Sequence, residues 1–141
     1  MARWMREIEI EAPPARVWQV MSDVERWPDW TTSMESVEKP DRPLGPGARV
    51  AVKPRGVGRS TWTVTSWRPG EGFVWETRVR GSRTLGNHEI MPNGEGRSRA
   101  RLTVEIPGSF GTLFRPLLSR GIEGNLELEA EGLKRRSEQA G

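Results

Sequence analysis

The 141-residue sequence has no cysteine and no tyrosine, and it has a single histidine. The lack of cysteine excludes disulfides, thiolate zinc sites and a cysteine nucleophile, and a lone histidine excludes the usual multi-histidine metal cages. We therefore expect no metal and no other cofactor. Long apolar runs and a basic N-terminal stretch before an apolar segment are also missing, so the sequence predicts a soluble, cytoplasmic protein without a membrane span.

A large excess of one charge is absent as well, because 22 basic and 19 acidic residues leave a net charge of +3. Nucleic-acid binding would need positive charge gathered on one face, so we expect no nucleic-acid partner. The sequence is rich in tryptophan, with seven residues of this type. Such large, flat, apolar side chains suit either a core or the wall of a ligand pocket.

The N-terminal part predicts one strand followed by a helical corner. Residues 4–11 alternate isoleucine with glutamate, which is typical of a strand with one wet face. A pair of prolines then fits the start of a helix of about two turns. Asp23 is a plausible N-cap for a second short helix over residues 24–30, broken at Pro28.

From residue 33 to residue 106 the sequence alternates in short runs separated by glycine and proline turns, which predicts a meander of about six antiparallel strands. The clearest alternation lies in residues 98–106, where serine, alanine, leucine, valine and isoleucine share one face. Residues 73–79 alternate in the same way. The predicted sheet therefore has an apolar face and an arginine-rich face.

The C-terminal part returns to a helical period. From Phe110 to about Arg136 the apolar residues form one stripe, and Ser109 could cap its start. Such a helix would be about 40 Å long, with a bend or an irregular first turn near Pro116. Residues 137–141 are polar and are expected to fray. The order of elements predicts one α+β domain over residues 1–141, in which the last helix covers the apolar sheet face.

Particular segments also carry a family resemblance. Residues 8–30, IEIEAPPARVWQVMSDVERWPDW, resemble the START-like (SRPBCC) superfamily, in its bacterial branch of polyketide cyclase/dehydrase and lipid-transport-like proteins. Residues 73–77, 88–96 and 110–118 support this resemblance. It implies the helix-grip fold, with about seven curved antiparallel strands around the long helix. It also implies an internal cavity for a lipid, a polyketide or another small hydrophobic molecule.

Strand parity selects the candidate site residues. His88 shares its face with the apolar Ile90, so it becomes the candidate acid or base, although it could simply fill space there. Arg6 shares parity with Ile8 and could bind an anionic oxygen, or turn out to solvent at the strand end. The candidate ligand-binding residues share an inward strand position or the apolar stripe of the last helix. They are Trp62, Phe73, Trp75, Thr77, Val79, His88, Leu102, Phe110, Phe114 and Leu117.

Three functions remain open from the sequence. Binding of a small hydrophobic ligand leads. The second is a polyketide cyclase, aromatase or dehydratase that uses His88 and Arg6, although the missing tyrosine argues against the usual cyclase site. The third is an interaction module that binds a macromolecule, for instance through outward-facing arginines at residues 78–80 and 97–101. Exposed edge strands leave a homodimer open.

Overall fold

The computed structural model describes residues 1–79 and 81–139 and has the predicted α+β helix-grip architecture. The elements, in chain order, are β1 (Ala2–Ile10), α1 (Pro14–Ser22), the 3-10 turn η1 (Val24–Arg26), α2 (Trp27–Trp30), β2 (Met34–Val37), β3 (Arg49–Pro54), β4 (Ser60–Arg68), β5 (Gly72–Val79), β6 (Ser82–Pro92), β7 (Ser98–Ile106) and α3 (Ser109–Glu138).

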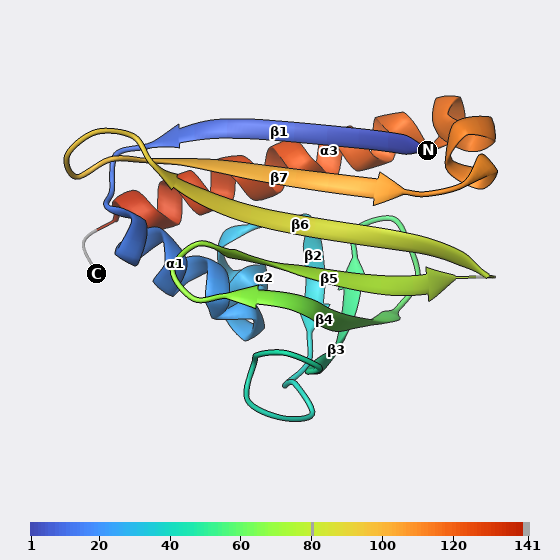
Figure 1. The fold of residues 1–141 in the computed structure, drawn as a ribbon, viewed down its shortest axis with the longest axis horizontal. Helices are drawn as coiled ribbons and strands as arrows, with labels where there is room; N and C mark the ends of the chain where they lie inside the picture. The colour runs from blue at the N-terminus through green and yellow to red at the C-terminus, as the bar shows by residue number, and fades with distance from the viewer. Residues whose placement is uncertain (80, 140–141) are drawn as a thin grey trace.

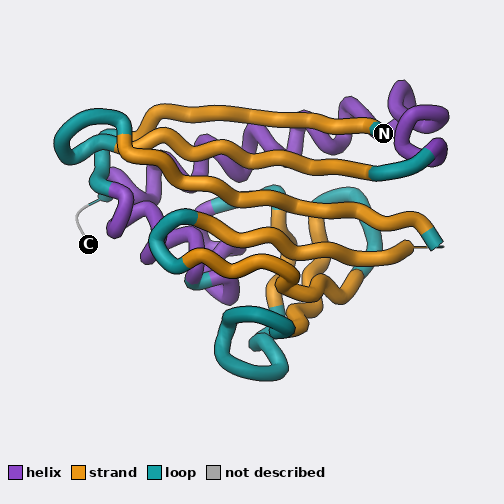
Figure 2. Tube along the Cα trace, viewed as in Figure 1, coloured by secondary structure: helices purple, strands orange, loops and turns teal. Residues whose placement is uncertain are grey.

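All strands belong to one antiparallel sheet with the order β1-β7-β6-β5-β4-β3-β2. The six strands from β2 to β7 form the predicted meander, and β1 pairs with β7 from Ala2 opposite Ile106 to Ile10 opposite Ser98. Figures 1 and 2 show the helices gathered on one side of this curved sheet, with α3 running behind β1 and β7. The long helix packs mainly on those two strands.

The outer face of β1 and β7 carries a ladder of ion pairs. Glutamates on β1 or just after it face arginines around β7, in the pairs Glu7 with Arg101, Glu9 with Arg99 and Glu11 with Arg97. The hydrogen bond from Arg101 Nε to Glu7 Oε2 is 2.6 Å long and raises the pKa of the arginine. Much of the arginine-rich face is therefore neutralised by the neighbouring strand.

The helical corner differs in detail from the sequence prediction. The break lies between η1 and α2, at Arg26 and Trp27, and Pro28 sits in the first turn of α2. Proline is tolerated there because the first turn leaves its N–H groups unbonded in any case. Asp23 makes no side-chain cap bond. The Trp27 indole N–H instead donates to the Met21 carbonyl at 3.0 Å and ties the two helices together.

The two ends of the long helix are held in different ways. Gly108, with a φ of +83°, occupies the N-cap position, and Ser109 is already helical and makes no cap bond. Pro116 lies inside the helix, and Figure 1 shows the first turns at an angle to the rest. The helix continues to Glu138, within the segment predicted to fray, and residues 140–141 of that segment lie outside the described part. Arg16 on α1 donates to carbonyls of the last turn and holds it.

Candidate functional site

The inner face of the sheet changes from sealed to open along its strands. On β5, Phe73 is fully buried, Trp75 is 3 % exposed and Val79 is 53 % exposed. The neighbouring β6 follows the same trend from the buried His88 to the partly exposed Thr84. The grip is therefore closed near α1 and α2 and open toward the β5–β6 turn. We call the latter the open end and define its inner wall by Trp62, Thr77, Val79, Thr84, Leu118 and Ile122.

Two polar contacts shape the rim of the open end. Arg55, just after β3, and Asn125 on α3 bond reciprocally, with the Arg55 Nε donating to the amide oxygen and the Asn125 Nδ2 donating to the Arg55 carbonyl, both at 3.2 Å. This pair closes the sheet onto the middle of the helix. On β4, the Trp62 indole N–H donates to the Ser60 hydroxyl at 2.9 Å, which orients the ring. The rim thus holds the half-buried Trp62 in one position.

Aromatic rings fill the closed end around His88. The imidazole stacks on Phe73, with ring centroids 4.4 Å apart and planes 16° apart. The rings of Trp27 and Trp75 follow at 5.3 and 5.6 Å. Such a cluster leaves little free volume at this depth. The tryptophans that the sequence could assign to either core or pocket wall therefore divide: Trp27 and Trp75 pack the interior, and Trp62 borders the open end.

A buried acid–base pair joins the sheet to the long helix. His88 Nε2 on β6 lies 3.5 Å from Glu129 Oε1 on α3, and both side chains are buried. The other ring nitrogen, Nδ1, lies 3.4 Å from the Phe73 carbonyl oxygen. The two ring nitrogens thus each face an oxygen atom, one on the sheet backbone and one on the long helix.

Glu129 is absent from the residues predicted above, although the sequence carries a signal for it. The residue falls between Leu126 and Leu133 on the buried stripe of α3, where a charged side chain is costly to bury without a partner. A carboxylate at that position of an apolar stripe indicates a polar partner across the core. The only imidazole of the chain, already placed inward by strand parity, was the obvious candidate.

Trp75 presents a further polar atom on the inner face. Its indole nitrogen is not one of the buried side-chain polar atoms without a partner in residues 1–79 and 81–139, which are Asn87 Oδ1, Thr103 Oγ1 and Ser137 Oγ. Gly86 on β6 lies directly beside it, because a Cβ at that glycine would come within 3.0 Å of Trp75 Nε1. The absence of a side chain at Gly86 therefore lets the indole lie close against the sheet. Trp75 and His88 thus lie side by side on the inner face, and His88 faces Glu129 on α3.

The remaining predicted residues fall into two sets. Leu102 is buried opposite His88, whereas Thr77 is buried at the open end, where it donates to the Thr61 carbonyl at 2.7 Å. In contrast, Phe110, Phe114 and Leu117 are exposed on the first turns of α3. The contacts of Arg6 are with the Glu7 carbonyl, at 2.8 Å, and with Glu131 on α3, at 3.8 Å. Those contacts place Arg6 beside the helix and not with His88.

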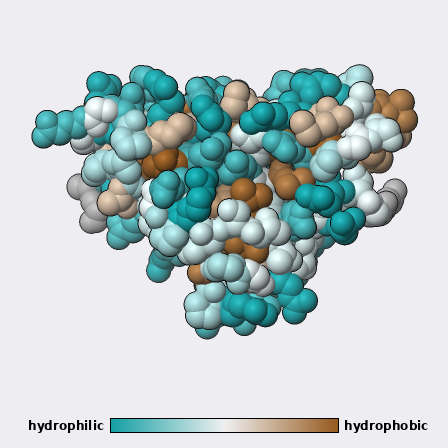
Figure 3. Space-filling view, in the orientation of Figure 1, coloured by the Kyte–Doolittle hydropathy of each residue, from teal (hydrophilic) through white to brown (hydrophobic). Residues whose placement is uncertain are grey.

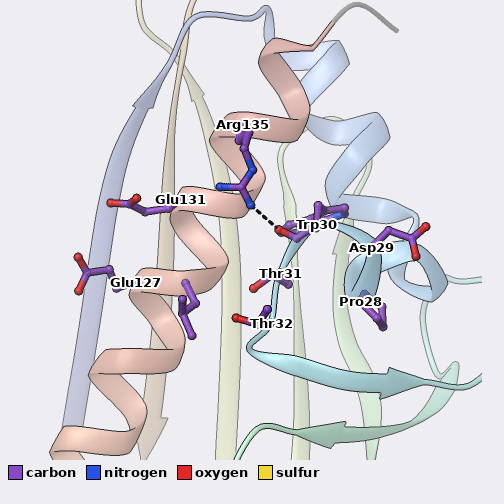
Figure 4. A pocket seen from close by; sticks show the side chains of 9 residues that line it. Pro28, Asp29, Trp30, Thr31, Thr32, Glu127, Glu131 and Arg135 are labelled. Carbon is purple, nitrogen blue, oxygen red and sulfur yellow. Dashed lines mark hydrogen bonds between the residues drawn. The ribbon is translucent and has the colours of Figure 1, made fainter.

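A surface hollow of about 340 Å³ lies between α2 and α3 and contains none of the predicted site residues. Figure 4 shows Arg135 donating to the Trp30 carbonyl, at 3.1 Å, while the Glu127 and Glu131 carboxylates point away from residues 30–32. Polar groups therefore do not converge there. Another hollow, of about 420 Å³, lies between residues 22–25 and 39–44 and likewise contains none of them.

Within residues 1–79 and 81–139, no three histidine, aspartate or glutamate side chains come together in a way that could hold a metal ion. Over the same residues, no helix combines the length and the apolar character that crossing a membrane requires.

Comparison with known proteins assigns the chain to a family. Residues 1–138 match the model of the family described as polyketide cyclase / dehydrase and lipid transport. No curated protein sequence matches the chain significantly.

Solved structures share the fold at low sequence identity. A protein of Thermus thermophilus is 24 % identical, with a TM-score of 0.72 over 96 % of this chain and 97 % of that chain. The Zhui aromatase/cyclase from Streptomyces sp. R1128 is 20 % identical, with a TM-score of 0.74 over 97 % and 93 %. A START superfamily protein from Mycobacterium smegmatis is 17 % identical, with a TM-score of 0.70 over 97 % of both chains. Because the family model matches residues 1–138, the chain belongs to the polyketide cyclase / dehydrase and lipid transport family.

Proposed function

We propose that this protein binds a small, mainly apolar molecule on the inner face of the grip and admits it through the open end. The observation that carries the proposal is the burial gradient along β5 and β6, from the sealed Phe73 to the exposed Val79. Inward-facing side chains that remain partly exposed form a ready apolar wall. Burial of that wall under a ligand is favourable, at about 25 cal/mol for each Å² of apolar surface.

The polar groups in the grip narrow the class of ligand. The Trp75 ring lies 5.6 Å from the His88 ring, and His88 in turn lies 3.5 Å from the buried Glu129 carboxylate. A carbonyl or hydroxyl oxygen on the ligand would accept a hydrogen bond from the indole or the imidazole N–H. The best fit is therefore a molecule with a flat apolar body and one oxygen-bearing end.

Relatives of the same fold support a ligand of this size. A norcoclaurine synthase from Thalictrum flavum is 13 % identical with a TM-score of 0.70, and its structure contains dopamine and hydroxybenzaldehyde. Those are small aromatic molecules with oxygen substituents. The likeness concerns the fold, so the present chain is expected to share a concave inner face and not a particular ligand.

The binding proposal is tested with prodan, a naphthalene ketone whose emission shifts to the blue in apolar surroundings. Wild type should bind it saturably. Thr84→Trp places a bulky ring on the inner wall of the open end and should weaken binding at least tenfold. Thr61→Trp is the matched control, because Thr61 is an exposed position on the outward side of β4, and it should bind as wild type does. Unsaturable binding, or equal binding by Thr84→Trp, would contradict the proposal.

A second candidate function, proton transfer on a bound ketone, is favoured by the His88–Glu129 pair. In the proposed step the pair takes a proton from the carbon beside the carbonyl, and a solvent-derived proton later returns to that carbon. In D₂O, deuterium uptake at the propionyl CH₂ of prodan should be faster with wild type than with Glu129→Gln or His88→Gln. Equal uptake by all three proteins would leave the pair a structural role only.

A further inference from the structure

Exposed apolar side chains gather on the first turns of α3. Phe110, Leu113, Phe114 and Leu117 follow the helical spacing i, i+3, i+4, i+7, so they share one face. Leu113 is 72 % exposed and Leu117 is 81 % exposed. Figure 3 shows hydrophobic residues at the upper right, over the start of this helix. It is unusual for one short helical face to expose two phenylalanine and two leucine side chains to water.

The same end of the molecule carries further apolar residues from other elements. The Met1 nitrogen donates to the Thr112 hydroxyl at 2.8 Å, which places the exposed Met1 beside the start of α3. The exposed Val79 lies at the β5–β6 turn, beyond the end of β7 from which α3 starts. We call this set of exposed residues the apolar rim; it consists of Met1, Val79, Phe110, Leu113, Phe114 and Leu117.

The charges beside the apolar rim are positive. Residues 109–122 contain Arg115 and Arg120 and no acidic residue. The exposed Arg78 precedes Val79. Within the described chain, none of these three arginines is paired with a carboxylate; Arg115 lies over the Trp4 ring, 5.0 Å from its centroid. A surface that combines exposed phenylalanine and leucine with unpaired arginine matches the boundary between water and an anionic lipid layer.

From this geometry we infer that the apolar rim docks on an anionic membrane surface, with the first turns of α3 lying in the interface. The helix rests on the surface and does not cross it. Docking would direct the open end toward the lipid, and only this consequence rests on the proposed binding function. The docking itself depends on the exposed residues and on their charge.

A second copy of the chain fits the apolar rim less well. A two-fold dimer buries the same patch of both copies, so it would bring the unpaired arginines of one copy toward those of the other. Pairing through the edge strand β1 is hindered too, because Arg115 donates to the Arg3 carbonyl and Lys134 donates to the Glu9 carbonyl. These side chains occupy backbone acceptors that a new strand would need.

The experiment is flotation with two kinds of vesicle, one of phosphatidylcholine alone and one with about 30 % phosphatidylglycerol. Wild type should float with the anionic vesicles and stay largely behind with the neutral ones. Leu113→Ser/Leu117→Ser should weaken binding at least tenfold because two apolar side chains no longer enter the interface. Arg120→Gln should weaken it about fivefold. Raising the salt concentration from about 0.1 M to about 0.5 M should weaken wild-type binding as well.

Met5→Ser is the matched control, since Met5 is 53 % exposed but lies in the middle of β1, on its outer face. It should float as wild type does. Prodan binding without vesicles should be unchanged in Arg120→Gln, which separates docking from ligand binding. Equal flotation with both vesicles, unchanged flotation of Leu113→Ser/Leu117→Ser, or a wild-type dimer that this variant dissociates would each overturn the inference.

Discussion

The two halves of α3 differ although they belong to one helix. Residues 123–138 bury Leu126, Ala130 and Leu133 against the sheet and the helical corner. Residues 109–122 leave their largest apolar side chains in water. An unbroken apolar stripe along a helix can therefore serve two purposes, with one half completing the core and the other half presenting a surface to a ligand or a membrane.

The two halves should differ most in how much stability is lost when a leucine is truncated to alanine. Leu133 is 1 % exposed, so Leu133→Ala should lower the free energy of unfolding by about 3 kcal/mol through lost burial and a cavity. Leu117→Ala should change it by less than about 0.5 kcal/mol. Urea unfolding of both variants measures the contrast. Similar losses in the two would mean that the first half is packed as tightly as the second.

The glycines of α3 offer the next contrast. A Cβ at Gly132 would overlap the Trp30 carbonyl oxygen, whereas a Cβ at Gly121 would meet no atom within 4 Å. We expect Gly132→Ala to destabilise the fold by about 2 kcal/mol, because helix and corner must move apart. Gly121→Ala should stabilise it by up to about 1 kcal/mol through helix propensity. Thermal unfolding measures whether each variant is more or less stable than wild type. A Gly132→Ala variant that is more stable than wild type would contradict the close contact.

A smaller change in stability is expected from Glu129, the acidic residue on the packed face that lies beside His88. Glu129→Ala and His88→Ala should each destabilise the protein, because the remaining partner is left buried and unpaired. The double variant should recover about 1 kcal/mol relative to the sum of the two changes. A coupling energy near zero, from urea titrations of all four proteins, would indicate that the two groups do not interact in the folded state.

The smallest effect concerns the end of the packed half and depends on pH. Lys134 and the Glu11 N–H bond to Glu138 and hold the pKa of this carboxyl below its usual 4.5. The stabilising contribution is therefore present above pH 4.5 and is lost as the pH falls below that value. Glu138→Gln should make the free energy of unfolding slightly less dependent on pH in this acid range; the effect is small because the pair is partly exposed. An unchanged pH dependence of the free energy of unfolding in this variant would exclude the contribution.

Much of the fold follows from the sequence because periodicity is a local property. The alternation of residues 98–106 predicts β7, and the proline pair predicts the start of α1; both predictions are confirmed. The corner was harder, since Pro28 can break a helix or begin one, and only the packing of Trp27 decides which. Asp23 occupies the predicted N-cap position but makes no side-chain cap bond, whereas the capping prediction for Ser109 is wrong because Gly108 occupies the N-cap. A side chain caps only if the backbone presents it to free N–H groups.

The candidate site was only partly predictable. Parity gave the inward position of His88, but its partner Glu129 depends on how α3 lies over the sheet, which no local pattern encodes. The exposure of Leu117 also depends on how α3 lies over the sheet. The apolar stripe continues through the whole helix, whereas the cover that the sheet provides ends near the β5–β6 turn. Burial is a property of the assembled layers and not of the stripe alone.

The pairing of β1 with β7 also bears on how the chain folds as it is made. Every residue of β1 pairs with a β7 residue that lies 88 to 104 positions later in the sequence. At about 5–20 residues per second, the first strand remains unpaired for roughly 5–20 s during synthesis. The meander from β2 to β6 can meanwhile form from neighbouring segments, so closure by β1, β7 and α3 is expected to come last and to limit the rate.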